Sequence, residues 1–252
     1  MASFIERKIR KGGRIRPPDW IAEWYRSELD SLCRALFQAD GEKVSREAIR
    51  HVFEKKAETL SDEFAHLCLW QSGGAYSKSM KGIRKSGDGL NPRSPKVAGE
   101  EGKIRKANAD LIRSIPEVYF EKKDAAVERM GENTPDYERR VADIHRITYN
   151  RVRIIAQDQT NKASELLALA RLETAGVSYV MWRHSGLPEK PRDYHKRRWD
   201  GSSGIRNGKP NGLNGFIFRI DNPPVIDLKT GERGYPSQLI NCKCFLIPVV
   251  IK

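Results

Sequence analysis

Residues 134–182, TPDYERRVADIHRITYNRVRIIAQDQTNKASELLALARLETAGVSYVMW, decide the fold because the spacing of apolar residues changes inside them. Thr134 is a good N-cap residue and Pro135 suits the first helical position, so a helix is predicted to begin here. Apolar residues then recur at three- and four-residue spacing, and Gly176 suits the position just after a helix. The residues that follow Gly176 are β-branched and aromatic, which is typical of a strand. The stretch therefore predicts a long helix that runs directly into a strand, with a break or bend near residues 158–161, where the apolar stripe weakens.

Two more helices are predicted before this stretch. Apolar residues at helical spacing follow Asp19 as far as Gly41, and a second stripe follows Ser45 as far as Cys68. Two helices joined by so short a turn favour an antiparallel hairpin. Cys33 and Cys68 lie on these stripes, so we interpret both thiols as small core residues.

The chain after the first strand is rich in glycine and proline and contains two further apolar runs. Residues 216–220 and 239–250 are predicted strands, and the segments between them are predicted long loops. The fold class predicted for the whole chain is therefore α+β. Its helical N-terminal two-thirds include a long helix and precede a small β-rich C-terminal unit with long loops.

Composition divides the chain into three predicted parts. Residues 1–70 hold a basic arm, residues 1–16, and the helical hairpin. Residues 71–106 mix glycine, proline and basic side chains, so they are predicted to be a flexible basic linker or arm. The third part is residues 107–252, with long helices at 135–175 and the β-rich unit at 177–252.

Positive charge is concentrated in three segments of the chain. The formal net charge of the whole chain is +13, yet residues 6–16, 78–106 and 190–209 alone carry +5, +6 and +5. The rest of the chain is therefore slightly acidic. Charge gathered in this way favours a polyanionic partner, most simply nucleic-acid phosphate, over a surface that is only soluble. The predicted phosphate-binding residues are Arg7, Lys8, Arg10, Lys11, Arg14, Arg16, Lys78, Lys81, Arg84, Lys85, Lys196, Arg197 and Arg198.

Cysteine and histidine residues near the C-terminus form a second candidate site. Cys242 and Cys244 are two residues apart in an extended segment, so both thiols face one side, where His195 could meet them. One interpretation is a zinc site, with His184 or Asp200 as the fourth ligand.

Two other interpretations of this site stay open. A Cys–His nucleophile pair would need an orienting group and an oxyanion hole, and the sequence shows neither. A structural clamp of buried thiols and a hydrogen-bonded histidine requires nothing further, and the residues alone favour it over a metal. No cofactor is expected to be required, and zinc is the alternative.

Several classes of protein are not expected from this sequence. It contains no phosphate-binding loop, no H-E-x-x-H and no G-x-S-x-G motif, so no catalytic residue is predicted. No apolar run approaches the roughly 18–20 residues of a membrane helix, so no membrane partner is expected. Four cysteines in 252 residues fit a chain made in a reducing cytoplasm.

Four segments of residues 135–252 resemble the phage Mu F-like, or SPP1-type, minor head protein family. They are the helical RIIAQDQTNK at 153–162, the strand GVSYVMW at 176–182, RDYH at 192–195 followed by Asp200-Gly201, and NCKC at 241–244 after Pro236. The resemblance lies in these four segments taken together and in order.

This resemblance implies a minor head, or capsid, protein of a tailed double-stranded DNA phage or prophage. Such a structural protein acts in head morphogenesis, is made in the host cytoplasm and ends inside the virion head near the portal. Its implied partners are the portal protein, the major capsid protein or both, and double-stranded DNA bound without regard to sequence. The alternative is a metal-dependent nuclease, with Asp193 and Asp200 as candidate Mg²⁺ ligands, or an injected DNA-binding effector built on the same C-terminal unit.

Overall fold

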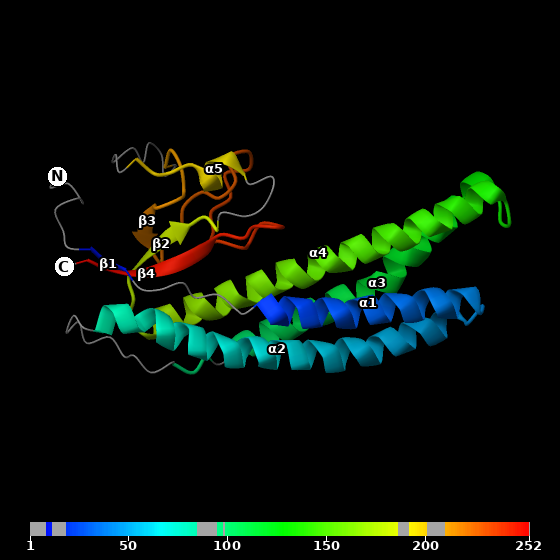
Figure 1. Cartoon of the computed structure of the whole chain (residues 1–252), viewed down its shortest axis with the longest axis horizontal. Helices are drawn as coiled ribbons and strands as arrows, with labels where there is room; N and C mark the ends of the chain where they lie inside the picture. The colour runs from blue at the N-terminus through cyan, green and yellow to red at the C-terminus, as the bar shows by residue number, and fades with distance from the viewer. Residues whose placement is uncertain are drawn as a thin grey trace. The chain divides into compact units, whose positions relative to one another are not determined.

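A computed structural model of the chain describes residues 9–11, 19–84, 95–97, 99–185, 192–200 and 210–251. Four long helices and a small antiparallel sheet make up this structure, so the predicted α+β class is confirmed (Figure 1). The helices are α1 (Asp19–Gly41), α2 (Arg46–Arg84), α3 (Glu100–Met130), α4 (Pro135–Thr174) and the short α5 (Asp193–Lys196). The strands are β1 (Ile9–Lys11), β2 (Tyr179–Arg183), β3 (Ile217–Arg219) and β4 (Phe245–Ile251). None of the described helices combines the length and the hydropathy needed to cross a membrane.

Both ends of α4 lie where the sequence predicts them. The Thr134 Oγ1 accepts a hydrogen bond of 3.1 Å from the backbone N–H of Tyr137, which satisfies a donor that the first turn leaves unpaired. At the other end Gly176 has φ +78°, and the N–H groups of Gly176 and Val177 donate to the carbonyls of Glu173 and Leu172. This is a Schellman motif, which needs a residue at positive φ. Helix α4 is continuous across residues 158–161, so the helix does not break there.

The prediction of a flexible linker at residues 71–106 is wrong for most of the described residues in this range. Helix α2 continues to Arg84, and α3 already begins at Glu100. The reason is tertiary packing. Residues 71–84 form the α2 extension, and its side chains Tyr76, Met80 and Ile83 are almost fully buried. Burying such side chains gains roughly 1.5–3 kcal/mol each. This gain outweighs the roughly 1 kcal/mol that each helical glycine costs.

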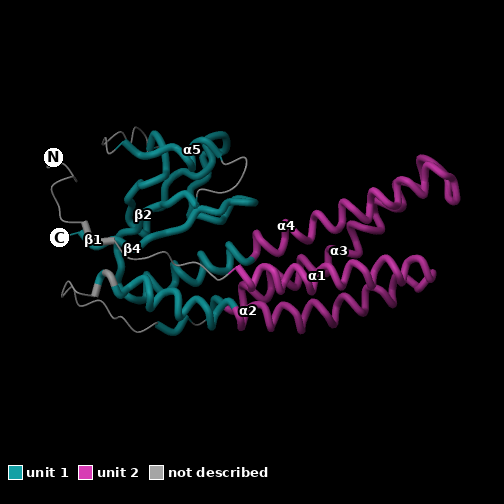
Figure 2. The backbone as a smooth tube through the Cα atoms, in the orientation of Figure 1, with its two compact units in different colours: residues 1–17, 68–100, 160–252 teal, residues 18–67, 101–159 magenta. Residues whose placement is uncertain are grey.

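Two compact units divide the chain, and neither follows the predicted boundaries (Figure 2). Unit 1 comprises residues 1–17, 68–100 and 160–252, and unit 2 comprises residues 18–67 and 101–159. The division falls within α2 and α4, so these two helices each contribute one part to each unit. The described residues of unit 2 form helices joined by turns at 42–45 and 131–134, whereas unit 1 holds the sheet.

The sheet has the strand order β1-β4-β2-β3, and every neighbouring pair is antiparallel. Residues 9–11 of the predicted N-terminal arm form its edge strand, with Arg10 opposite Val250. The prediction of an arm over residues 1–16 is therefore corrected for these three residues. Pro248, which has no N–H to donate, lies opposite Val180 on the β2 side, and pairing with β1 begins only at Val249.

The core of unit 1 lies between the sheet and the parts of α2 and α4 that belong to this unit. Trp182 and Leu246 from the sheet and Leu172 from α4 are almost completely buried there. Cys242 and Cys244 belong to the same buried cluster. The two thiols that sequence reasoning assigned to helical cores, Cys33 and Cys68, are also buried.

Candidate metal centre

Two short segments of unit 1 bring the predicted His195, Cys242 and Cys244 together. His195 lies on α5, which is held to the following loop because the N–H of Leu213 donates to the Tyr194 carbonyl at 3.0 Å. Gly212 is needed at this contact, since a Cβ there would collide with the Arg197 carbonyl. The cysteines precede β4 in a turn in which the N–H of Cys242 donates to the Leu239 carbonyl at 3.0 Å.

The three side chains form a compact, buried group. The His195 Nδ1 lies 3.6 Å from the Cys242 Sγ and 3.9 Å from the Cys244 Sγ. All three atoms lie within 4.8 Å of one another, and the residues are no more than 5% exposed. The expectation that both thiols face His195 is thus met, and these residues could hold a metal ion.

The hydrogen bonding of His195 leaves its Nδ1 available as a ligand. Its Nε2 lies 2.9 Å from the Ile226 carbonyl. A carbonyl oxygen only accepts, so Nε2 carries the proton and Nδ1 presents a lone pair to the two thiols. Metal-bound histidines show this arrangement, in which the second ring nitrogen donates to a backbone carbonyl or carboxylate.

The two cysteines titrate as a pair. The pKa of Cys242 is lowered chiefly because the Cys244 thiol donates to its sulfur, although burial acts in the opposite direction. The pKa of Cys244 is raised by that same shared proton and by burial. The indole N–H of Trp182 opposes this rise, although it makes no hydrogen bond of ordinary geometry. A thiolate is the form that binds metals, and the lowered pKa of Cys242 brings this side chain closer to that form.

Glu165 of α4 is a fourth buried group beside this site. It is 5% exposed, it accepts a hydrogen bond from the Leu246 N–H, and its Oε1 has no hydrogen-bond partner. Burial, followed by the nearby Cys242, raises the pKa of its carboxyl group. Sequence reasoning missed Glu165, yet a signal existed. Glu165 shares a helical stripe with the apolar residues Ala168, Leu169 and Leu172, where a charged side chain is out of place.

The two fourth ligands suggested by the sequence lie outside the compact group. His184 follows β2 and is half-buried, and burial lowers its pKa. Asp200 is exposed. Among the described residues, the group of three within 4.8 Å contains neither. A nucleophilic role for either thiol is also disfavoured, because both are buried away from solvent.

All thirteen predicted phosphate-binding residues fall within the residue ranges of unit 1. Lys78 and Lys81 on α2 are exposed, as are the three consecutive cations Lys196, Arg197 and Arg198. Arg84 ends α2, and Arg10 and Lys11 belong to β1. Outside the described residues lie Arg7, Lys8, Arg14, Arg16 and Lys85.

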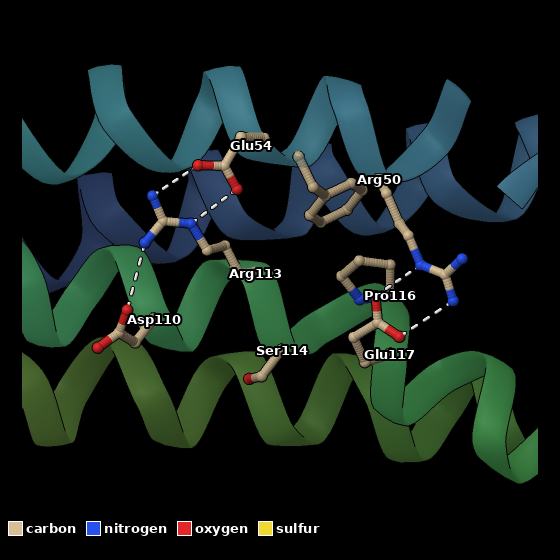
Figure 3. A pocket seen from close by; sticks show the side chains of 8 residues that line it. Arg50, Glu54, Asp110, Arg113, Ser114, Pro116 and Glu117 are labelled. Carbon is tan, nitrogen blue, oxygen red and sulfur yellow. Dashed lines mark hydrogen bonds and ion pairs between the residues drawn. The ribbon is translucent and has the colours of Figure 1, made fainter. Parts of the chain in front are cut away.

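Unit 2 contains a pocket of about 460 Å³ between α2 and α3, lined by two arginines (Figure 3). Arg50 pairs with Glu117 at 2.7 Å, and Arg113 pairs with Glu54 at 2.7 Å. These ion pairs join the two helices and neutralise both guanidinium groups. The pocket is therefore a weaker candidate for phosphate than the cations of unit 1.

Comparison with protein-family models, with curated proteins and with solved structures gives no significant match for this chain.

Proposed function

We propose that this chain is a minor head protein of a tailed double-stranded DNA phage, which acts near the portal and contacts packaged DNA. One observation carries the proposal: residues from three of the four segments that resemble the phage minor head protein family lie close together in the structure. Trp182, His195 and the two cysteines of NCKC lie in one buried cluster, with the Trp182 and His195 rings 5.1 Å apart. Short segments that matched by chance would not be expected to gather around one buried group.

The proposed contact with DNA rests on the distribution of cations. Exposed lysines and arginines of unit 1 would meet phosphates, whereas the arginines of the unit 2 pocket already have carboxylate partners. Phosphate contacts supply affinity without sequence preference. Binding of this kind suits a protein that meets whatever genome is packaged.

We propose that zinc is the ion at His195, Cys242 and Cys244, and that its role is structural. One imidazole nitrogen and two thiolates are a soft donor set that zinc accepts. The buried position fits a site that stabilises the β-rich unit. Metal analysis of protein purified without chelator tests this, and about one zinc per chain is expected. A metal content near zero would contradict the proposal.

Salt dependence of binding tests the DNA contact. If each basic segment meets two phosphates, the plot of log affinity against log salt should have a slope of about −5 for duplex DNA. The paired change Arg197→Gln and Arg198→Gln should reduce the magnitude of that slope by about 2. The matched control is Lys55→Gln with Lys56→Gln, two exposed lysines of unit 2 that should leave the slope unchanged. Equal slopes for both double variants would refute this assignment.

Particle composition tests the class of protein. In phage particles induced from the bacterium that carries the gene, mass spectrometry of purified heads should find this chain together with the portal protein. Its absence from heads that contain the portal would exclude a minor head protein, whatever the outcome of the DNA measurements.

A further inference from the structure

We infer that Glu165 is the fourth ligand of the metal, so that the site joins α4 to α5 and to the segment before β4. This inference rests on the proposed zinc at His195, Cys242 and Cys244. It adds a residue outside the resembling segments and gives the site a closed, four-ligand form. A closed tetrahedral set is typical of structural zinc, whereas catalytic zinc keeps one position open.

Burial is the first argument. Glu165 is 5% exposed in the core of unit 1, and its Oε1 has no hydrogen-bond partner. A buried carboxylate oxygen without a partner is costly, and buried charges are usually paired or bound to metals. Among the described residues, no cation forms an ion pair with Glu165, so a bound metal ion would supply the partner that Oε1 lacks.

Position is the second argument. The Glu165 carboxylate accepts a hydrogen bond from the N–H of Leu246, two residues after Cys244 in the sequence. It also interacts electrostatically with both Cys242 and Cys244. The carboxylate lies outside the group of three within 4.8 Å, so we expect ion binding to draw it toward the two sulfur atoms.

Charge balance is the third argument. Two thiolates, one neutral imidazole and one carboxylate would surround Zn²⁺ with a net charge of −1. Two N–H groups are placed to offset this excess: the Leu246 N–H donates to Glu165, and the Trp182 N–H acts on Cys244. Such outer N–H groups are a regular part of metal sites.

Zinc affinity and cobalt spectra of Glu165 variants test the inference. Glu165→Gln should weaken zinc binding by about 10–100-fold or more in a chelator competition. Changes to groups that only hydrogen-bond to the metal ligands already have effects of this size. Glu173→Gln, an exposed glutamate of the same helix, is the matched control and should bind zinc like the unaltered chain. Circular dichroism shows whether each variant is folded.

A second variant keeps the test decisive if Glu165→Gln fails to fold. Glu165→Cys replaces the carboxylate by a third thiolate, and the cobalt–thiolate charge-transfer absorbance should rise about 1.5-fold, as expected for three thiolates instead of two. Unchanged absorbance in a folded Glu165→Cys chain would overturn the inference, as would unchanged zinc affinity in Glu165→Gln. Neither result would contradict the proposal that His195, Cys242 and Cys244 bind zinc. An unaltered chain that binds neither zinc nor cobalt would instead refute the metal itself.

Discussion

Thr134 and Gly176 determine the ends of α4 through backbone groups that the helix itself leaves unpaired. The threonine oxygen accepts from the N–H of Tyr137, and the positive φ of Gly176 allows two N–H groups to turn back onto the last turn. Both residues act locally, so their roles could be predicted from sequence. Glu165 also lies on α4, but its surroundings come from segments distant in the chain.

Replacing Thr134 by alanine should lower the free energy of unfolding by about 1 kcal/mol, the usual cost of losing an N-cap. Urea denaturation of the two chains measures this difference. Thr59→Ala is the control, because that hydroxyl bonds only to carbonyls of its own helix and caps nothing. An equal loss in both variants would show that the cap contributes no stability of its own.

His145 should make stability depend on pH. Its ring stacks on Phe37 at 3.9 Å, and its Nε2 lies 3.2 Å from the Tyr119 hydroxyl, which donates to Asp40. Burial, aided by the nearby Lys123, lowers the pKa of His145 below its ordinary 6.5, although Asp40 acts in the opposite direction. The unfolded chain therefore takes up this proton first, and stability is lost as the pH falls below about 6.5.

The measurement is the free energy of unfolding at pH 8 and at pH 5. The unaltered chain should lose more stability between these values than His145→Gln does. His51→Gln, at an exposed position of α2, should lose as much as the unaltered chain. If His145→Gln and the unaltered chain have identical pH profiles, the histidine does not contribute.

At the scale of elements, the α2 extension shows where local signals mislead. Gly73 and Gly74 suggest a break, yet Tyr76, Met80 and Ile83 follow at spacings of four and three, which is the pattern of one helix face. The pattern was too short to outweigh the glycines in sequence reasoning, and its buried partners come from distant parts of the chain.

Strand β1 was missed for a related reason. Three residues carry almost no strand signal, and their partner β4 lies at the other end of the sequence.

Gly74→Ala tests the helical extension directly. A Cβ at this position meets nothing within 4 Å, so alanine should stabilise the chain by about 0.5–1 kcal/mol. Gly176→Ala is the opposite case: its φ of +78° should make alanine destabilising. Denaturation midpoints check both. A destabilised Gly74→Ala chain would mean that α2 does not continue through this position.

At the scale of the whole molecule, all proposed metal ligands belong to unit 1, although α2 and α4 extend into both units. Removing the metal should therefore affect the two units unequally, because metal-binding energy is folding energy for the part that holds the ion.

Amide hydrogen exchange with and without a zinc chelator measures this difference. We expect the chelator to speed exchange in β2 and β4 and to leave α1 unchanged. A His195→Ala chain, which lacks one ligand, should not respond to the chelator. Equal acceleration in α1 and β4 would contradict a stabilising role confined to unit 1.

The pairing of β1 with β4 has a consequence for any shortened form of this protein. Residues 249–251 would lose their neighbour if residues 9–11 were removed, and β4 would then present a bare row of N–H and C=O groups. Such an edge is a template for strands of other chains, and it promotes aggregation or strand exchange between copies. A deletion meant only to remove positive charge should therefore end at residue 8. A deletion that extends to residue 16 would change the association state of the protein as well as its charge.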